Sequence, residues 1–206
     1  VSTENELSRV IPIIQLISKG FPNIIISVDT FRSTVADQAV NSGAHMINDI
    51  SGGNLDSNMF KTVSKLDVPY ILMHMRGSPK NMMSKTDYEN VTKDVCKYFS
   101  ERIDKAKSFG INDIIIDPGF GFSKTTQQNY ELFNNLEFFK EFQRPIIVGI
   151  SRKSMIYKIL NTTPEKALNG SSVLHTISLM KGANILRTHD VKEALECVKI
   201  VSQLNG

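Results

Sequence analysis

The chain has 206 residues, of which 41% are hydrophobic and 22% are charged, and its formal net charge is only +3. This composition is typical of a globular protein with a sizeable core and excludes a disordered chain. No apolar run approaches the roughly 20 residues that cross a bilayer. The weak, evenly spread charge argues against nucleic acid binding. We therefore expect one domain over residues 1–206, with neither a membrane nor a nucleic acid as partner.

The only cysteines, Cys96 and Cys197, lie far apart in segments with a helical pattern. They predict neither a disulfide framework nor a Cys-rich metal site, and they favour a reducing compartment. We expect a cytoplasmic protein. Because the first residue is Val1 rather than Met, a removed organellar targeting sequence remains an alternative.

Apolar and amphipathic segments alternate along the chain, beginning with an expected helix near residues 4–19. Short runs rich in Ile and Val predict strands at 23–30, 45–52, 69–75, 113–119, 145–151 and 183–190. One helix is expected from about Ser33, and the clearest spans 87–109 and stops at Gly110. Alternating strands and helices predict an α/β fold with a parallel sheet. Either a doubly wound sheet or an eight-stranded barrel would fit.

Polar residues stand at the end of almost every expected strand, where ligands bind in parallel α/β folds. They are Asp29, Asn48 with Asp49, His74 with Arg76, Asp117, Ser151 to Lys153, and Arg187 with His189. Asp29 has an equally good alternative role, because its position just before the helix at Ser33 suits a helix cap. Such a charged mixture is poor core material and favours a polar ligand with cationic and anionic parts.

Strand alternation groups these residues further, because every second residue shares a face. It places Arg187 with His189, and Gly149 with Ser151 and, if the extended path continues, Lys153. Three roles for this lysine remain open: a Schiff base, a hydrogen-bond donor to a substrate, or a surface residue at a helix start. The adjacent Arg152 would favour a neutral amine on the lysine. Glycines 119 and 149 would admit close approach by a ligand.

Several stretches resemble, in order, the dihydropteroate synthase family: "ISVDTFRSTVADQAVNSGAHMINDISGG", "ILMHMRGSP", "IIIDPGFGFSKT", "VGISRKSMI" and "LRTHDV". The resemblance implies a TIM (β/α)8 barrel, of which this chain supplies about strands three to eight and lacks the first two strands with their loops. It implies an enzyme of folate biosynthesis and a target of sulfonamides. The reaction joins 6-hydroxymethyl-7,8-dihydropterin diphosphate to p-aminobenzoate, giving 7,8-dihydropteroate and diphosphate.

The resemblance also implies a role for individual residues. Pterin binding is implied for Asp29, Asn48, Met73, Asp117, Gly149, Lys153 and Arg187. Contacts to p-aminobenzoate are implied for Phe122, Ser151 and Lys153, and contacts to diphosphate for Arg187 and His189. Among these, Asp29, Asp117 and Lys153 are the implied catalytic residues.

The same resemblance implies a Mg²⁺ ion, whose expected protein ligand lies in the family's first strand, so no metal ligand is expected in this chain. It further implies a homodimer and, as in some members, fusion to other folate-pathway enzymes. Two other functions remain open: a pterin-binding methyltransferase domain, and a non-catalytic fragment that binds a partner. The pairing of "SRKS" with "RTHD" argues against the methyltransferase. A barrel aldolase that uses Lys153 is a third alternative.

Overall fold

The computed structural model describes residues 1–204 and divides into two compact units. The first unit comprises Val1–His74 and Phe99–Ile115, and the second Met75–Tyr98 and the residues from Ile116 onward. Elements of the first half are α1 (Thr3–Gly20), β1 (Ser27–Asp29), α2 (Ser33–Asn41), β2 (Met46–Asp49), α3 (Met59–Leu66), β3 (Tyr70–Met73), the 3-10 helix η1 (Met82–Ser84) and α4 (Val91–Ser108). Those of the second half are β4 (Ile114–Asp117), α5 (Thr126–Asn134), η2 (Leu136–Phe142), β5 (Ile147–Val148), α6 (Ser154–Tyr157), η3 (Pro164–Lys166), α7 (Leu168–Met180), β6 (Ile185–Leu186) and α8 (Val191–Leu204).

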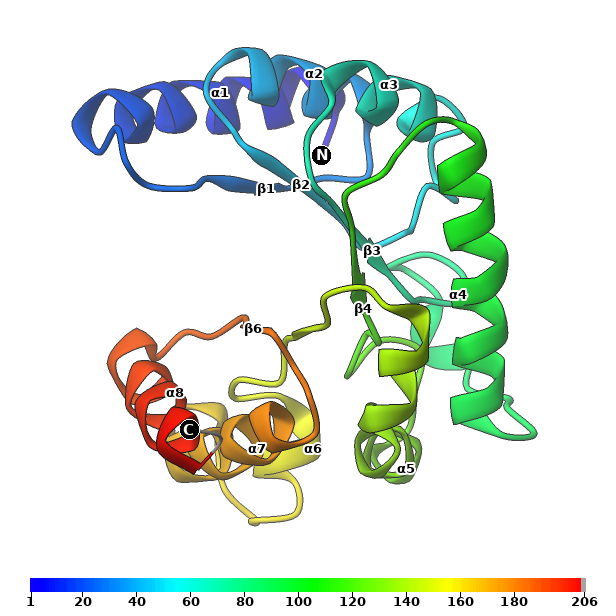
Figure 1. Ribbon diagram of the computed structural model, residues 1–206, viewed down its shortest axis with the longest axis vertical. Coiled ribbons are helices and arrows are strands. Elements are labelled where there is room, and N and C mark those ends of the chain that lie inside the picture. The colour runs from blue at the N-terminus through cyan, green and yellow to red at the C-terminus, as the bar shows by residue number, and fades with distance from the viewer. Residues whose placement is uncertain (205–206) are drawn as a thin grey trace. The chain divides into compact units, whose positions relative to one another are not determined.

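The first unit is built on the parallel strands β1, β2 and β3, and helices α1, α2 and α3 lie along one side of them (Figure 1). The register pairs Asp29 with Asn48 and Ile47 with Tyr70. All four residues of β3 are buried, as expected for a strand that is covered on both faces. The strands expected here exist, but each is shorter than its apolar run.

Helix α4 begins four residues later than expected, at Val91 rather than residue 87. Asn90 precedes it, and the Asn90 side-chain oxygen accepts a hydrogen bond of 2.8 Å from the backbone N–H of Lys93. This is the geometry of a helix N-cap, so the helical pattern of the sequence extends past the true start of the helix. The expected end is confirmed, since Gly110 follows with a φ of +90° that favours glycine.

Strand order separates the two architectures that fit the sequence. The larger sheet has the order β1-β2-β3-β4. A parallel bridge then joins Ile116 of β4 to Ile146, directly before β5, and β5 pairs in parallel with β6. Neighbours in space are thus neighbours along the chain throughout, whereas a doubly wound sheet reverses its order at a switch point. The doubly wound alternative is therefore wrong, and the sequential order is that of a barrel.

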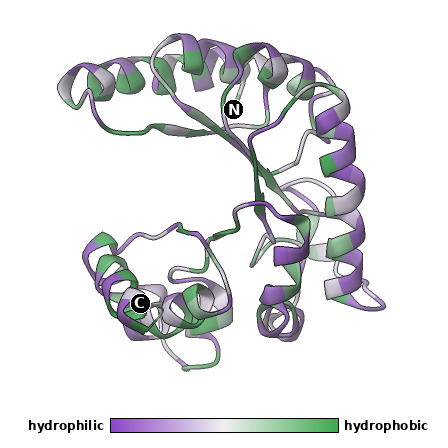
Figure 2. Ribbon diagram, in the orientation of Figure 1, coloured by the Kyte–Doolittle hydropathy of each residue, from purple (hydrophilic) through white to green (hydrophobic). Residues whose placement is uncertain are grey.

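The second unit has an apolar core around strand β5 and the loop after β4. Phe120 packs edge to face on Phe133 of α5, with 5.7 Å between ring centroids. Strand β5 and the flanking Ile146 and Ile150 are buried. In Figure 2 strands β3 and β4 are coloured as hydrophobic, whereas α4 is largely hydrophilic. No helix among residues 1–204 is long and apolar enough to cross a membrane.

Candidate active site

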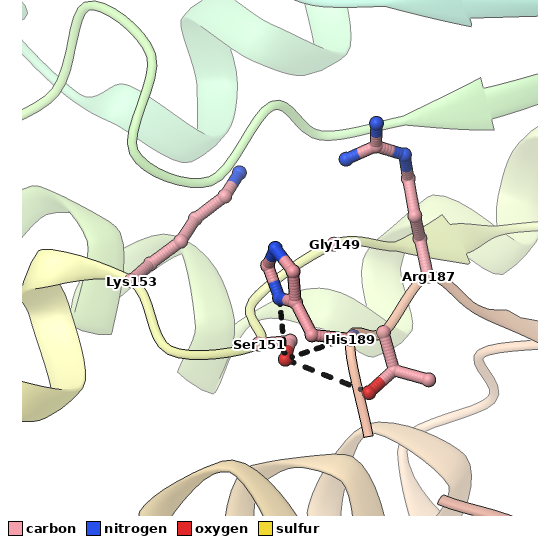
Figure 3. Close-up of a pocket in the computed structure, with 6 residues that line it drawn as sticks. Gly149, Ser151, Lys153, Arg187 and His189 are labelled. Atoms are coloured by element: carbon pink, nitrogen blue, oxygen red, sulfur yellow. Dashed lines mark hydrogen bonds between the residues drawn. The ribbon is translucent and has the colours of Figure 1, made fainter. Parts of the chain in front are cut away.

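A pocket of about 200 Å³ lies at the carboxyl ends of β5 and β6. It is lined by Gly149, Ser151, Lys153, Arg187, Thr188 and His189. The two strand ends stay paired up to the pocket, because the backbone N–H of Arg187 donates to the carbonyl of Val148 at 2.9 Å. The long side chains of Lys153, Arg187 and His189 extend to the same side of the backbone (Figure 3). The sequence placed these residues together correctly.

Lys153 reaches the pocket by a route that strand alternation does not describe. Arg152 has a left-handed φ of +54°, and the backbone N–H of Lys153 donates to the carbonyl of Ile150 at 3.1 Å. The chain therefore turns sharply before α6 begins at Ser154, and the expected continuation of the extended path is wrong. The turn brings the lysine to the pocket from the loop instead of from the strand.

The loop after β4 holds the side chain of Lys153. Its ammonium group donates to the carbonyl of Phe120 and lies 4.7 Å from the ring centroid of Phe122. Gly121 has a φ of +81°, and a Cβ atom there would lie 3.1 Å from Cδ of Lys153. Glycine is therefore favoured both by the backbone and by the close approach of the lysine. Phe122 and Lys153, both expected to contact p-aminobenzoate, are brought together.

Asp117 ends β4 as a buried carboxylate, only 6% exposed, which accepts a hydrogen bond of 2.8 Å from the backbone N–H of Gly119. Burial raises its pKa, and the charges of Lys153, Lys124 and Arg187 oppose that rise. Burial lowers the pKa of Lys153 to about 8; the Asp117 carboxylate opposes this shift and the Arg187 cation adds to it. The cation that affects the lysine is thus Arg187 rather than the adjacent Arg152, contrary to the sequence-based expectation.

Ser151 and His189 are hydrogen-bonded to each other in the pocket. The Ser151 hydroxyl oxygen accepts from the backbone N–H of His189 at 3.2 Å and lies 3.0 Å from Nδ1 of the imidazole (Figure 3). When the hydroxyl donates its one proton to Nδ1, the other ring nitrogen, Nε2, carries the N–H of the neutral imidazole. In this tautomer His189 offers a hydrogen-bond donor to an anion.

Lys124 is the buried group that sequence reasoning missed. It is 2% exposed, and its ammonium donates to the carbonyls of Gly119 at 2.9 Å and Phe122 at 3.1 Å. Burial lowers its pKa to about 7. A lysine in a polar loop reads as solvent-exposed in a sequence. The one available signal was its position five residues after the glycine that follows Asp117-Pro118, which allows the side chain to fold back over the loop.

In the first unit, the predicted pterin-binding residues Asp29 and Asn48 contact each other. The Asn48 amide nitrogen donates to Asp29 at 2.7 Å, and the Asn48 oxygen is buried with no hydrogen-bond partner among residues 1–204. Met73, the third such residue of this unit, is buried at the end of β3. The helix-cap alternative for Asp29 is wrong, because the N-cap residue of α2 is Arg32 and the N–H of Ser33 donates to Asp56 at 2.7 Å.

Asp49 stands beside Asn48 at a strand end but has a structural role. It is fully buried, and its carboxylate accepts hydrogen bonds from the backbone N–H groups of Ser51 and Gly53, both at 2.8 Å. The hydroxyl groups of Ser51 and Tyr70 also donate to it, both at 2.7 Å. A carboxylate that accepts four hydrogen bonds is satisfied by the protein itself.

Comparison with known proteins gives the same interpretation over nearly the whole chain. The family "Pterin binding enzyme" matches residues 1–189. Dihydropteroate synthase from Escherichia coli is 41% identical over 203 residues, which cover 98% of this chain and 71% of that protein. The mitochondrial folate synthesis bifunctional protein from Pisum sativum is 39% identical over 97% of this chain and 42% of that protein.

A solved structure of Yersinia pestis dihydropteroate synthase with a sulfonamide drug superposes with a TM-score of 0.96 and 37% sequence identity, covering 100% of this chain and 75% of that one. The (β/α)8 barrel class agrees with the sequential strand order described above. The chain belongs to the pterin-binding enzyme family and, within it, to the dihydropteroate synthases.

Proposed function

We propose that this chain catalyses the condensation of 6-hydroxymethyl-7,8-dihydropterin diphosphate with p-aminobenzoate. The amine nitrogen of p-aminobenzoate forms a bond to the pterin methylene carbon while the bond from that carbon to the diphosphate oxygen breaks. The amine loses a proton, the diphosphate keeps the bonding electron pair, and the products are 7,8-dihydropteroate and diphosphate. No covalent intermediate with the protein is needed, so Lys153 acts as a hydrogen-bond donor and not as a Schiff base.

One observation carries the proposal: Lys153, which lies over the ring of Phe122, lines the same pocket as two groups that can bind an anion, Arg187 and His189. An aromatic face beside an ammonium suits an aromatic carboxylate. A guanidinium and an imidazole N–H suit the phosphate oxygens of a leaving diphosphate, whose growing negative charge they stabilise.

The buried Asp117 carboxylate is our candidate for binding the amide and amino edge of the pterin. The charges of Lys153 and Arg187 favour the ionised form of this carboxylate, which accepts hydrogen bonds. A ligand that brings N–H donors would compensate the cost of burying it. Gly149 leaves the floor of the pocket without a side chain, and Ser151 sets the orientation of His189. The catalytic roles of Asp117 and Lys153 remain proposals.

For the first unit, we likewise propose pterin binding by Asp29, Asn48 and Met73. The buried, unpaired oxygen of Asn48 supports it, since such an oxygen is costly unless a ligand donates to it. Charge stabilisation by Asp29, an exposed residue whose carboxylate accepts from Asn48, completes the proposed catalytic set.

The Mg²⁺ implied by the resemblance stays a proposal, because its expected protein ligand belongs to the family's first strand. Among residues 1–204, no group of three or more His, Cys, Asp or Glu side chains is arranged to hold a metal ion. No step of the reaction is assigned to the ion. The homodimer and the fusion to other folate-pathway enzymes also stay proposals, the latter supported by the name of the bifunctional pea relative.

The direct test is to supply both substrates to the full-length natural chain and to detect 7,8-dihydropteroate and diphosphate. We expect Asp117→Asn to lose most of the activity and the calorimetric affinity for the pterin diphosphate. Asp67→Asn is the matched control, because Asp67 is exposed and has a left-handed backbone that Asn tolerates well. Binding of methyltetrahydrofolate in preference to the diphosphate, with no product formed, would point to the methyltransferase instead.

A further inference from the structure

Arg152, the first of the two cations in "SRKS", forms hydrogen bonds to the loop that carries His189. Nε of Arg152 donates to Asp190 at 2.8 Å and its Nη2 to the other carboxylate oxygen at 2.7 Å, which is a bidentate ion pair. The third nitrogen, Nη1, donates to the carbonyls of Pro164 at 3.0 Å and Glu165 at 2.6 Å. All three guanidinium nitrogens of Arg152 therefore have protein acceptors.

This ion pair lies outside the pocket but is adjacent in sequence to the residues that line it. The pocket lining includes Ser151, Lys153 and His189 and omits Arg152 and Asp190. The left-handed backbone of Arg152 separates its side chain from those of its two neighbours. In addition, the Arg152 N–H donates to the hydroxyl of Ser171 on α7 at 2.9 Å.

Two tripeptides, 151–153 and 188–190, are consequently joined at two points. Inside the pocket the Ser151 hydroxyl holds His189, and outside it the Arg152 guanidinium holds Asp190. The N–H of Asp190 also donates to the hydroxyl of Thr188 at 3.1 Å, which fixes the backbone on either side of the histidine. Two joints between two short segments restrict their relative rotation, which one joint alone would leave free.

We propose that Arg152 and Asp190 form a clasp that positions Ser151, Lys153 and His189 for the reaction, without touching substrate. The inference rests on the proposed function, because it assumes that His189 binds diphosphate and Lys153 binds the substrate rings. A left-handed arginine supports the clasp, since such a backbone costs energy and persists where surrounding contacts hold it. The rival role is direct binding of the substrate's anion by Arg152. It conflicts with the structure, because the guanidinium of Arg152 already donates to Asp190 and to two carbonyls.

The test compares Arg152→Lys, Asp190→Asn and the double variant in the full-length natural chain. Arg152→Lys keeps the charge but loses the planar fork, and Asp190→Asn keeps the shape but loses the charge. We expect each single variant to lower kcat/KM on the order of 100-fold, the effect of a misplacement of about 1 Å, and to weaken the calorimetric binding of inorganic diphosphate. The double variant should be no worse than the poorer single variant, because both changes open the same clasp.

Asp94→Asn is the control, because it removes the carboxylate from another ion pair of the same unit, that of Arg76 and Asp94 at 2.9 Å. It should leave diphosphate binding unchanged. If Arg152 bound the anion itself, Asp190→Asn would keep or strengthen diphosphate binding while Arg152→Lys weakened it, and the clasp would be wrong. Lower urea midpoints with unchanged kcat/KM would show a purely structural ion pair. Failure of the wild-type enzyme to bind diphosphate would instead overturn the proposed function.

Discussion

Two lysines lie near one buried carboxylate in the second unit, and backbone carbonyls hold both ammonium groups. Lys153 donates to Phe120, and Lys124 donates to Gly119 and Phe122. The charges of both lysines act on Asp117. Burial lowers the pKa of Lys153 to about 8 and that of Lys124 to about 7, so both titrate closer to neutral pH than an ordinary lysine.

The lowered pKa of Lys153 predicts a loss of activity in mildly alkaline solution. As the pH rises through about 8, the ammonium loses the proton that the proposed mechanism uses as a hydrogen-bond donor. We expect kcat/KM to fall over this range in the wild type. Lys153→Arg should have lower activity but no fall there, because a guanidinium stays charged. A fall at the same pH in that variant would assign the titration to another group.

Lys124 predicts a pH dependence of stability. The folded protein holds its amine with a pKa of about 7, against 10.5 for the ordinary group, so between these values only the unfolded chain binds the proton. The cost of burying the charge is thus full below about pH 7 and disappears as the pH rises toward 10.5, which increases the free energy of unfolding.

Urea unfolding of the wild type and Lys124→Met at about pH 7 and about pH 9.5 measures this, because titrations common to both chains cancel in the difference. The stability of the wild type relative to the variant should rise by up to about 3 kcal/mol over that range. A difference that does not change with pH would show that Lys124 remains charged in the folded protein.

At the scale of elements, the loop after β4 depends on the absence of a side chain at residue 121. Gly121→Ala would place a Cβ atom 3.1 Å from Cδ of Lys153 in a left-handed backbone. We expect it to cost about 1 to 3 kcal/mol of stability and to displace the lysine, with a larger effect on kcat/KM than its stability loss explains.

Gly149→Ala is the matched control for that loop. A Cβ atom at Gly149 would meet Arg187 at 3.8 Å, which is ordinary van der Waals contact. Its stability loss in urea should be smaller than that of Gly121→Ala, although an added methyl group in the pocket should weaken ligand binding. Equal stability losses would contradict the steric argument for Gly121.

The sequence predicts the six strands and the clustering of Ser151, Lys153, Arg187 and His189, because apolar runs and strand ends are local patterns. It does not predict that α4 starts after Asn90, because the helical pattern begins before that residue. Nor does it predict the left-handed turn at Arg152. Both depend on hydrogen bonds that form only in the folded chain. The buried Lys124 was missed for the same reason, since its partners are carbonyls of its own loop.

At the scale of the whole molecule, the predicted homodimer is the property most open to test. Helix α8 exposes Val191, Leu195 and Val198, which lie on one face of the helix, by 61%, 53% and 40%. This is a large exposed apolar face for one helix, as expected of a subunit contact. Light scattering after gel filtration should give twice the chain mass for the wild type and a lower mass for Leu195→Glu. Lys199→Glu is the control for the added charge. A monomeric wild type would contradict the prediction.

The sequential strand order also bears on how the chain folds. Asp29 pairs with Asn48 19 residues later, and the backbone N–H of Ile146 donates to the side-chain oxygen of Asn184, 38 positions along. In these pairs a strand thus meets the next one after only one intervening crossover, so the entropy of loop closure is small at these steps. During synthesis, each new strand emerges next to a strand already made. The polypeptide can therefore extend its sheet from the N-terminal end while translation continues, without waiting for distant segments.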